Sequence, residues 1–95
     1  MAKRRIRVVY GCQYTKGIDG SPEYASWIAG VRQEFADLGW TLTSQGPTMS
    51  STNVDEDELN LESDGEPLAA AELRAALERV GIDPLYFSGD GADSA

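Results

Sequence analysis

Apolar and polar residues alternate along several short stretches of this chain, a pattern typical of strands that bury one face. Residues 5–10, 40–46 and 58–62 alternate in this way, and residues 83–87 form a short final apolar stretch. The pattern predicts four strands. The side chains expected to point inward from the first and third strands are Ile6, Val8, Tyr10, Leu59 and Leu61.

Two other stretches repeat apolar residues every three or four positions, which predicts amphipathic helices. The first is expected to begin with Ser21 as N-cap and Pro22 at the first helical position, and to end at Gly39. The second is expected to open at Pro67 and to end at Gly81. Each helix is long enough to cover a small sheet.

The resulting order, βαββαβ, indicates a ferredoxin-like α+β sandwich. That fold has a four-stranded antiparallel sheet in the order 4-1-3-2, with both helices on one face. A small thioredoxin-like arrangement with one further strand is the alternative. We expect one domain over residues 1–87 and a flexible acidic tail over residues 88–95.

Charge is distributed unevenly along the 95 residues. Residues 1–16 carry five basic residues and no acid, whereas residues 17–95 carry all 16 acids and only three arginines, for a net charge of −8. Such a surface repels nucleic acid at long range and attracts basic partners. The composition therefore favours a protein partner over a nucleic acid, and nothing in it calls for a membrane span.

The densest acidic run, residues 54–67, holds seven carboxylates and no basic side chain. In the predicted sheet Glu58 and Glu62 lie beside Arg5 and Arg7, where each cross-strand pair contributes roughly 0.2–1 kcal/mol. The carboxylates left without an evident partner are Asp55, Glu56, Asp57, Asp64 and Glu66. Together with Glu34, Asp37 and the tail aspartates, they predict either an acidic docking surface or simply a solvated rim.

The chain has no histidine and one cysteine, Cys12, which excludes an internal disulfide, Cys/His zinc sites and Cys–His or Ser–His nucleophile pairs. We expect Cys12 to be a small buried hydrophobe. Residues 60–71 have spacing similar to a calcium-binding loop, but the twelfth position is Ala71 instead of a bidentate glutamate. No catalytic residue, metal or cofactor is therefore predicted.

The glycine-rich loop Gly11–Ser21 offers a different function. Lys16, Gly17 and Ser21 precede a predicted helix and could hold an anion with backbone N–H groups and one positive charge. A connection that merely links strand to helix is the simpler interpretation. RNA binding across the open sheet face is disfavoured, because Glu58 and Glu62 would repel phosphates there.

These patterns favour a small, acidic, non-catalytic interaction protein of the cytoplasm. We expect it to bind and inhibit or regulate a basic, nucleic-acid-binding protein, as viral nucleic-acid mimics from phages do with host defence nucleases. The predicted contact residues are Asp55, Glu56, Asp57, Asp64, Glu66 and, if it turns outward instead of packing in the core, Trp27. An anion- or small-molecule-binding regulatory domain built on Gly11–Ser21 is the alternative, and an enzyme that uses carboxylates or tyrosine alone comes third. The chain is expected to be a monomer or a homodimer that pairs through edge strand 40–46.

Overall fold

The computed structural model describes residues 3–18, 20–48, 56–89 and 92–93. Over this part of the chain neither helix has the length and hydrophobicity that crossing a bilayer requires. The elements, in chain order, are β1 (Arg4–Gly11), the 3-10 turn η1 (Cys12–Tyr14), α1 (Pro22–Ala36), β2 (Thr41–Pro47), β3 (Glu56–Ser63), β4 (Leu68–Ala69), α2 (Ala70–Arg79), β5 (Pro84–Ser88) and β6 (Ala92–Asp93).

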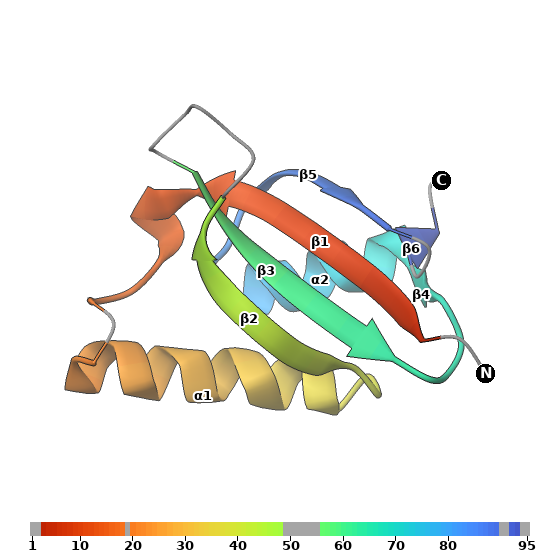
Figure 1. Ribbon diagram of the computed structural model, residues 1–95, viewed down its shortest axis with the longest axis horizontal. Coiled ribbons are helices and arrows are strands. Elements are labelled where there is room, and N and C mark those ends of the chain that lie inside the picture. Colours follow the sequence, from red (N-terminus) through yellow and green to blue (C-terminus); the bar gives the residue numbers. More distant parts are fainter. Residues whose placement is uncertain (1–2, 19, 49–55, 90–91, 94–95) are drawn as a thin grey trace.

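Four strands form one antiparallel sheet in the order β2-β3-β1-β5, the main sheet (Figure 1). Side chains from both helices join the inward side chains of this sheet in a single apolar cluster, so α1 and α2 cover the same face. The structure thus confirms an α+β fold with a four-stranded antiparallel sheet and two helices. The thioredoxin-like alternative is wrong, because a thioredoxin-like sheet contains parallel neighbours and this one does not.

A second, two-stranded sheet separates the chain from the standard ferredoxin-like arrangement. Leu68–Ala69 pair in parallel with Ala92–Asp93, so the strand before α2 and the strand after β5 both lie outside the main sheet. The prediction that Pro67 opens the second helix is wrong, because Leu68 and Ala69 form β4 and the helix begins only at Ala70. Leu68 is buried in the core, and extended backbone brings it there before the helix begins at Ala70.

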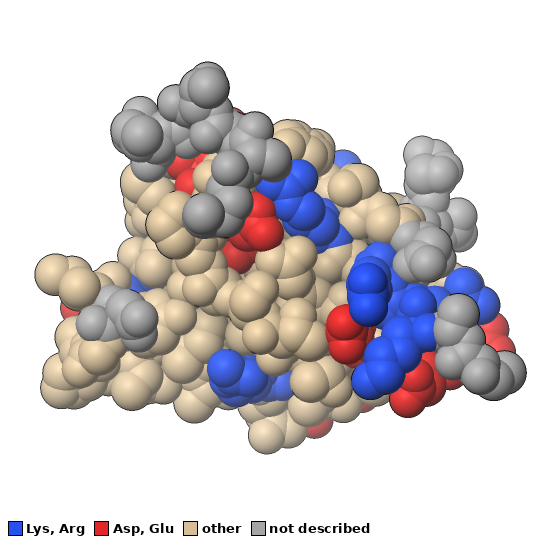
Figure 2. Space-filling model, viewed as in Figure 1, with Lys and Arg blue, Asp and Glu red and all other residues tan. Residues whose placement is uncertain are grey.

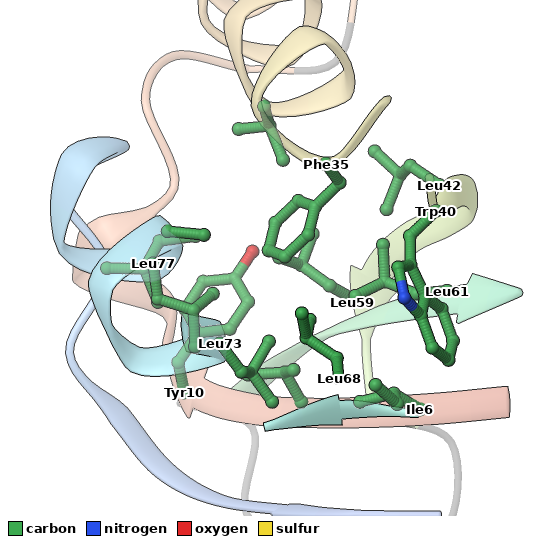
Figure 3. Packing of buried hydrophobic residues seen from close by; sticks show 14 residues of the cluster. Ile6, Tyr10, Phe35, Trp40, Leu42, Leu59, Leu61, Leu68, Leu73 and Leu77 are labelled. Carbon is green, nitrogen blue, oxygen red and sulfur yellow. The ribbon is translucent and has the colours of Figure 1, made fainter. Parts of the chain in front are cut away.

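The core lies between the main sheet and the two helices (Figure 3). Tyr10 and Leu59 from the sheet and Phe35 from α1 are fully buried, as predicted from their periodicity. Trp40 is also buried, with 2% of its surface exposed. Truncating such a side chain typically costs 2–5 kcal/mol, because the surrounding atoms close the cavity only partly.

The predicted ends of α1 are confirmed. The Ser21 hydroxyl accepts a hydrogen bond from the Tyr24 backbone N–H at 3.1 Å and so caps the first turn. The helix ends at Ala36, and Gly39 closes the turn that follows with a φ of 84°, a left-handed conformation that costs glycine little. The chain then turns directly into β2, which places α1 against the sheet.

Candidate functional site

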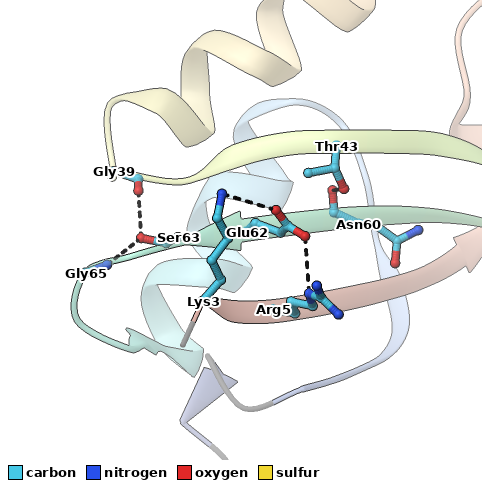
Figure 4. A network of polar contacts seen from close by, with 8 residues as sticks. All are labelled: Lys3, Arg5, Gly39, Thr43, Asn60, Glu62, Ser63 and Gly65. Atoms are coloured by element: carbon cyan, nitrogen blue, oxygen red, sulfur yellow. Dashed lines mark hydrogen bonds and ion pairs between the residues drawn. The ribbon is translucent and has the colours of Figure 1, made fainter. Parts of the chain in front are cut away.

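The face of the main sheet opposite the helices, the open face, carries the predicted charge pairs between β1 and β3. Arg5 lies opposite Glu62 in the register, and its Nε donates to a Glu62 carboxylate oxygen at 3.2 Å. The Lys3 ammonium lies 3.7 Å from the other oxygen of the same carboxylate (Figure 4). Arg7 pairs with Glu58 at 2.9 Å. The expectation that opposite charges meet across these two strands is confirmed.

In each of these pairs the basic side chain is more exposed to solvent than the carboxylate. The side chains of Lys3 and Arg5 are 57% and 74% exposed, against 26% for Glu62. Arg7 is 30% exposed and Glu58 only 17%. Figure 2 shows basic side chains gathered at one end of the visible face, with acidic side chains beside them. On the open face the basic side chains are therefore more exposed than the carboxylates of β3 with which they pair.

Glu58 is held from two sides. Burial disfavours its charged form, but hydrogen bonds from the Asn60 amide at 2.7 Å and from Arg7 outweigh this effect and keep the pKa of Glu58 below its usual value. The hydrogen bond to Glu58 in turn raises the pKa of Arg7. Both groups therefore stay charged at neutral pH.

A groove of about 430 Å³, the open-face groove, crosses this face. All four strands of the main sheet or their ends contribute to it, and it is lined by Arg5, Ile6, Arg7, Thr43, Ser44, Asn60, Leu61, Glu62, Ser88 and Gly89. Gly89 is required there, since a Cβ would lie 2.1 Å from the Arg5 carbonyl oxygen. The lining combines two guanidinium groups with hydroxyl and amide groups.

A second polar cluster lies at the other end of β3, where β1 and β2 also end. Gln45 is its centre: its amide donates to the Tyr10 hydroxyl at 2.8 Å, and its carbonyl oxygen accepts from the Tyr24 hydroxyl at 2.7 Å. The Thr15 hydroxyl donates to Asp57 at 2.5 Å and lies 3.1 Å from the Tyr10 oxygen. We call these five residues the Tyr10–Asp57 network. A cavity of about 220 Å³ lies beside it.

The Tyr10–Asp57 network holds a tyrosine with altered acidity. Burial raises the pKa of Tyr10 to about 12, even though hydrogen bonds with Thr15 and Gln45 act in the opposite direction. The hydroxyl therefore stays protonated over the physiological range. The sequence gives no sign of this network, because its members come from β1, the following loop, α1, β2 and β3.

The structure divides the predicted acidic contact residues between the two ends of β3. Glu56 and Asp57 are half-buried at one end, and Asp57 accepts hydrogen bonds from the network. Asp64 and Glu66 are exposed in the turn after the other end. Asp55 lies outside the described residues.

Two further acids of the predicted surface are engaged within the chain. Glu34, which was counted with the acidic surface, forms an ion pair with Arg79 of α2. Asp37 accepts a hydrogen bond from the Gln33 amide one turn earlier on α1, at 2.8 Å. Of these two carboxylates only that of Glu34 is paired with a positive charge, and Asp37 remains exposed.

Trp27 turns mainly inward. It packs against the core, its ring centroid lies 5.9 Å from that of Tyr24, and its Nε1–H donates to the Val80 carbonyl oxygen at 3.3 Å. Because this contact joins α1 to the end of α2, much of the ring serves the packing of the two helices. Part of the surface of Trp27 remains exposed.

Two of the predicted anion ligands in the loop Gly11–Ser21 lie close together, since a Cβ on Gly17 would be 2.8 Å from the Ser21 hydroxyl oxygen. The Ser21 hydroxyl accepts from the backbone N–H groups of Ile18 and Tyr24 and so serves as the helix cap, while Lys16 is exposed. The expectation for Cys12 is wrong: the thiol is exposed, because the 3-10 turn that follows β1 lies outside the core. Among the described residues, no cluster of His, Cys, Asp and Glu is arranged to hold a metal ion.

No protein-family model, characterised protein or solved structure matches this chain. Its functional assignment therefore depends on the geometry described above.

Proposed function

We propose that this chain is a small, acidic, non-catalytic interaction protein that binds a basic protein surface. The observation that supports the proposal is the state of the turn between β3 and β4. The side chains of Asp64 and Glu66 are exposed there, and neither forms an ion pair within the described part of the chain. With a net charge of −8 on the whole chain, such carboxylates attract cations from a partner.

The spacing of the acidic groups favours a macromolecule as that partner. Asp57 lies near the start of β3 and Asp64 just after its end, so about 23 Å of extended chain separates the two groups of predicted contact residues. A small ligand spans much less than that, whereas a protein interface of ordinary size covers roughly 800 Å² on each partner and reaches both ends.

We further propose that the partner is a nucleic-acid-binding protein. Its Lys/Arg groove is already shaped for spaced negative charge, and electrostatic complementarity speeds association and selects the partner. Occupying that groove would inhibit or regulate the partner, as phage-type inhibitors of host defence nuclease complexes do. An exposed, unpaired Cys12 suits the reducing cytoplasm, where we place the protein.

The protonation and hydrogen bonding of the polar groups in the Tyr10–Asp57 network support a non-catalytic role. Tyr10, with a pKa of about 12, remains protonated and is a poor general base. Asp57 and Thr15 are bound to each other inside the Tyr10–Asp57 network. The strongest polar contacts at this end of the sheet thus serve the fold, which leaves recognition as the more economical function.

The test is calorimetry and analytical sizing against a panel of purified basic nucleic-acid-binding domains. We expect a complex that weakens with salt and that loses about tenfold or more in affinity, ~1.4 kcal/mol, in Asp64→Asn/Glu66→Gln. The matched control is Glu78→Gln/Asp83→Asn, which removes the same charge from exposed positions near the other end of α2. If both double variants lose affinity equally, the turn is not the docking site; if no domain of the panel binds, the proposal fails.

For the fold, we propose a variant of the ferredoxin-like sandwich in which β4 and β6 are additions. The four strands of the main sheet follow one another as β5, β1, β3 and β2, which supports this interpretation. Deleting residues 90–95 tests it: the shortened chain should keep the cross-strand contacts of the main sheet in NMR spectra, and their loss would contradict an added β6.

A further inference from the structure

The open-face groove is a candidate site that the proposed docking function does not use. The side chains of Lys3 and Arg5 are more exposed to an approaching solute than that of Glu62, whose carboxylate lies between them. The groove holds Arg5 and Arg7 two residues apart on one face of β1, so both guanidinium groups project over the same side of the sheet.

Neutral hydrogen-bonding groups complete this site. The Ser44 hydroxyl accepts from the Asn60 amide at 3.0 Å, which orients it and leaves its own proton for another acceptor. Ser88 adds a hydroxyl opposite Arg7 in the register. A volume of about 430 Å³ lies within the range of small-molecule sites, roughly 300–1,000 Å³.

We propose that the open-face groove binds a small molecule that carries an oxyanion, either a carboxylate or a phosphate, with Arg5 and Arg7 as its main ligands. Guanidinium groups present planar pairs of N–H donors that match the two oxygens of such a group. Glu62 orients Arg5 before the ligand arrives and shares it afterwards.

A small anion fits this protein better than a nucleic-acid strand does. The net charge of −8 repels a polyanion at every phosphate, whereas a small ligand interacts mainly with charges within the Debye length of about 8 Å. Among the described residues that line the groove, Arg5 and Arg7 are positively charged and Glu62 is negatively charged, so the lining carries one net positive charge. The ligand is therefore expected to carry one or two negative charges.

The test is an NMR titration of the ¹⁵N-labelled protein with inorganic phosphate and, separately, with succinate, at constant ionic strength. We expect saturable shifts at the amides of Arg5, Arg7, Asn60 and Ser88, and the tighter of the two probes identifies the oxyanion. Arg5→Gln should weaken binding about tenfold. Because the Arg5 side chain is 74% exposed, this variant is expected to fold, which its melting curve verifies.

Lys16→Gln is the matched control, since it removes one positive charge from the loop Gly11–Ser21 and leaves the groove intact. Its affinity should stay within roughly twofold of the parent. Shifts confined to residues 16–21 and lost in Lys16→Gln would overturn the proposal in favour of the loop. The absence of saturable shifts with both probes, or tighter binding of a single-stranded oligonucleotide at physiological salt, would also overturn it. Asp64→Asn/Glu66→Gln should keep anion binding, so the two proposals fail independently.

Discussion

The two ends of β3 hold carboxylates by different means. At the end near η1, Asp57 accepts hydrogen bonds from two neutral groups, the Thr15 hydroxyl at 2.5 Å and the Gln45 amide at 3.4 Å. At the other end, Glu62 is held by two cations, Lys3 and Arg5. The same functional group, a carboxylate, is thus built into the fold at one end of the strand and into a charged surface at the other.

This difference separates stability from recognition. Neutral hydrogen bonds in a half-buried network depend on geometry and are insensitive to salt, and breaking them leaves buried polar groups without partners. Exposed ion pairs contribute only about 0–1 kcal/mol and are screened by salt. We infer that the Asp57 end stabilises the protein, whereas the Glu62 end keeps cations available to a ligand.

The largest effect on stability is expected when alkali deprotonates Tyr10, which lies in the network at the Asp57 end of β3. Because folding raises the pKa of Tyr10 from 10.0 to about 12, its contribution to stability is complete below pH 10 and is lost as the pH rises toward 12. A shift of that size corresponds to about 2–3 kcal/mol. Urea unfolding at a series of alkaline pH values should show this loss, and Tyr10→Phe should remove it. An equal alkaline loss in Tyr10→Phe would contradict the assignment.

Removing the centre of the Tyr10–Asp57 network should have the next largest effect. Gln45→Ala deletes the partner of Tyr10 and Tyr24 and leaves the buried Tyr10 hydroxyl with fewer hydrogen bonds, at a cost of about 1–3 kcal/mol. Thr41→Ala, an exposed change on the same strand, is the control and should stay within about 0.5 kcal/mol. Equal destabilisation of both variants would show that the network has no special role.

The contribution of Glu58, near the centre of β3, to the stability of the fold should decrease in acid. The pKa of Glu58 is lowered in the folded state, so its contribution is present above the ordinary value of 4.5 and is lost as the pH falls through the folded value. We expect Glu58→Gln to cost about 1 kcal/mol at neutral pH and to flatten the decline in stability below pH 4.5. Glu78→Gln, an exposed change on α2, should leave that decline unchanged. Chemical unfolding at neutral and acidic pH compares the three proteins.

The smallest effect on stability is expected from replacing Glu62, at the end of β3 where the carboxylate is held by Lys3 and Arg5. Glu62→Gln should cost about 0.5 kcal/mol or less at low salt, and the difference from the parent should vanish near 1 M salt, where the Debye length is about 3 Å. Melting curves at two salt concentrations measure this, with Gln45→Ala as the reference whose cost should persist. A salt-independent loss in Glu62→Gln would show that the two ends of β3 do not differ as described.

The sequence by itself determined the elements that depend on near neighbours. The strand periods, the Ser21 cap, the glycine stops and the pairing of Arg5 with Glu62 were all predictable, because each depends on local spacing or on one register between two strands. The turn carboxylates Asp64 and Glu66 were predictable as exposed acids for the same reason. The prediction for Cys12 was wrong, since a residue type alone does not indicate which side of a loop faces the core.

Only the tertiary structure decided the arrangement of groups far apart in the chain. Gln45 donates a hydrogen bond to Tyr10, which lies 35 positions earlier in the sequence. Leu68–Ala69 pair with Ala92–Asp93, where the sequence predicted the first turn of the second helix. The structure also placed the longer, more flexible side chains of Lys3 and Arg5 outside the Glu62 carboxylate. The accessible charge of a surface depends on which partner of a pair lies outermost, and that is a property of packing.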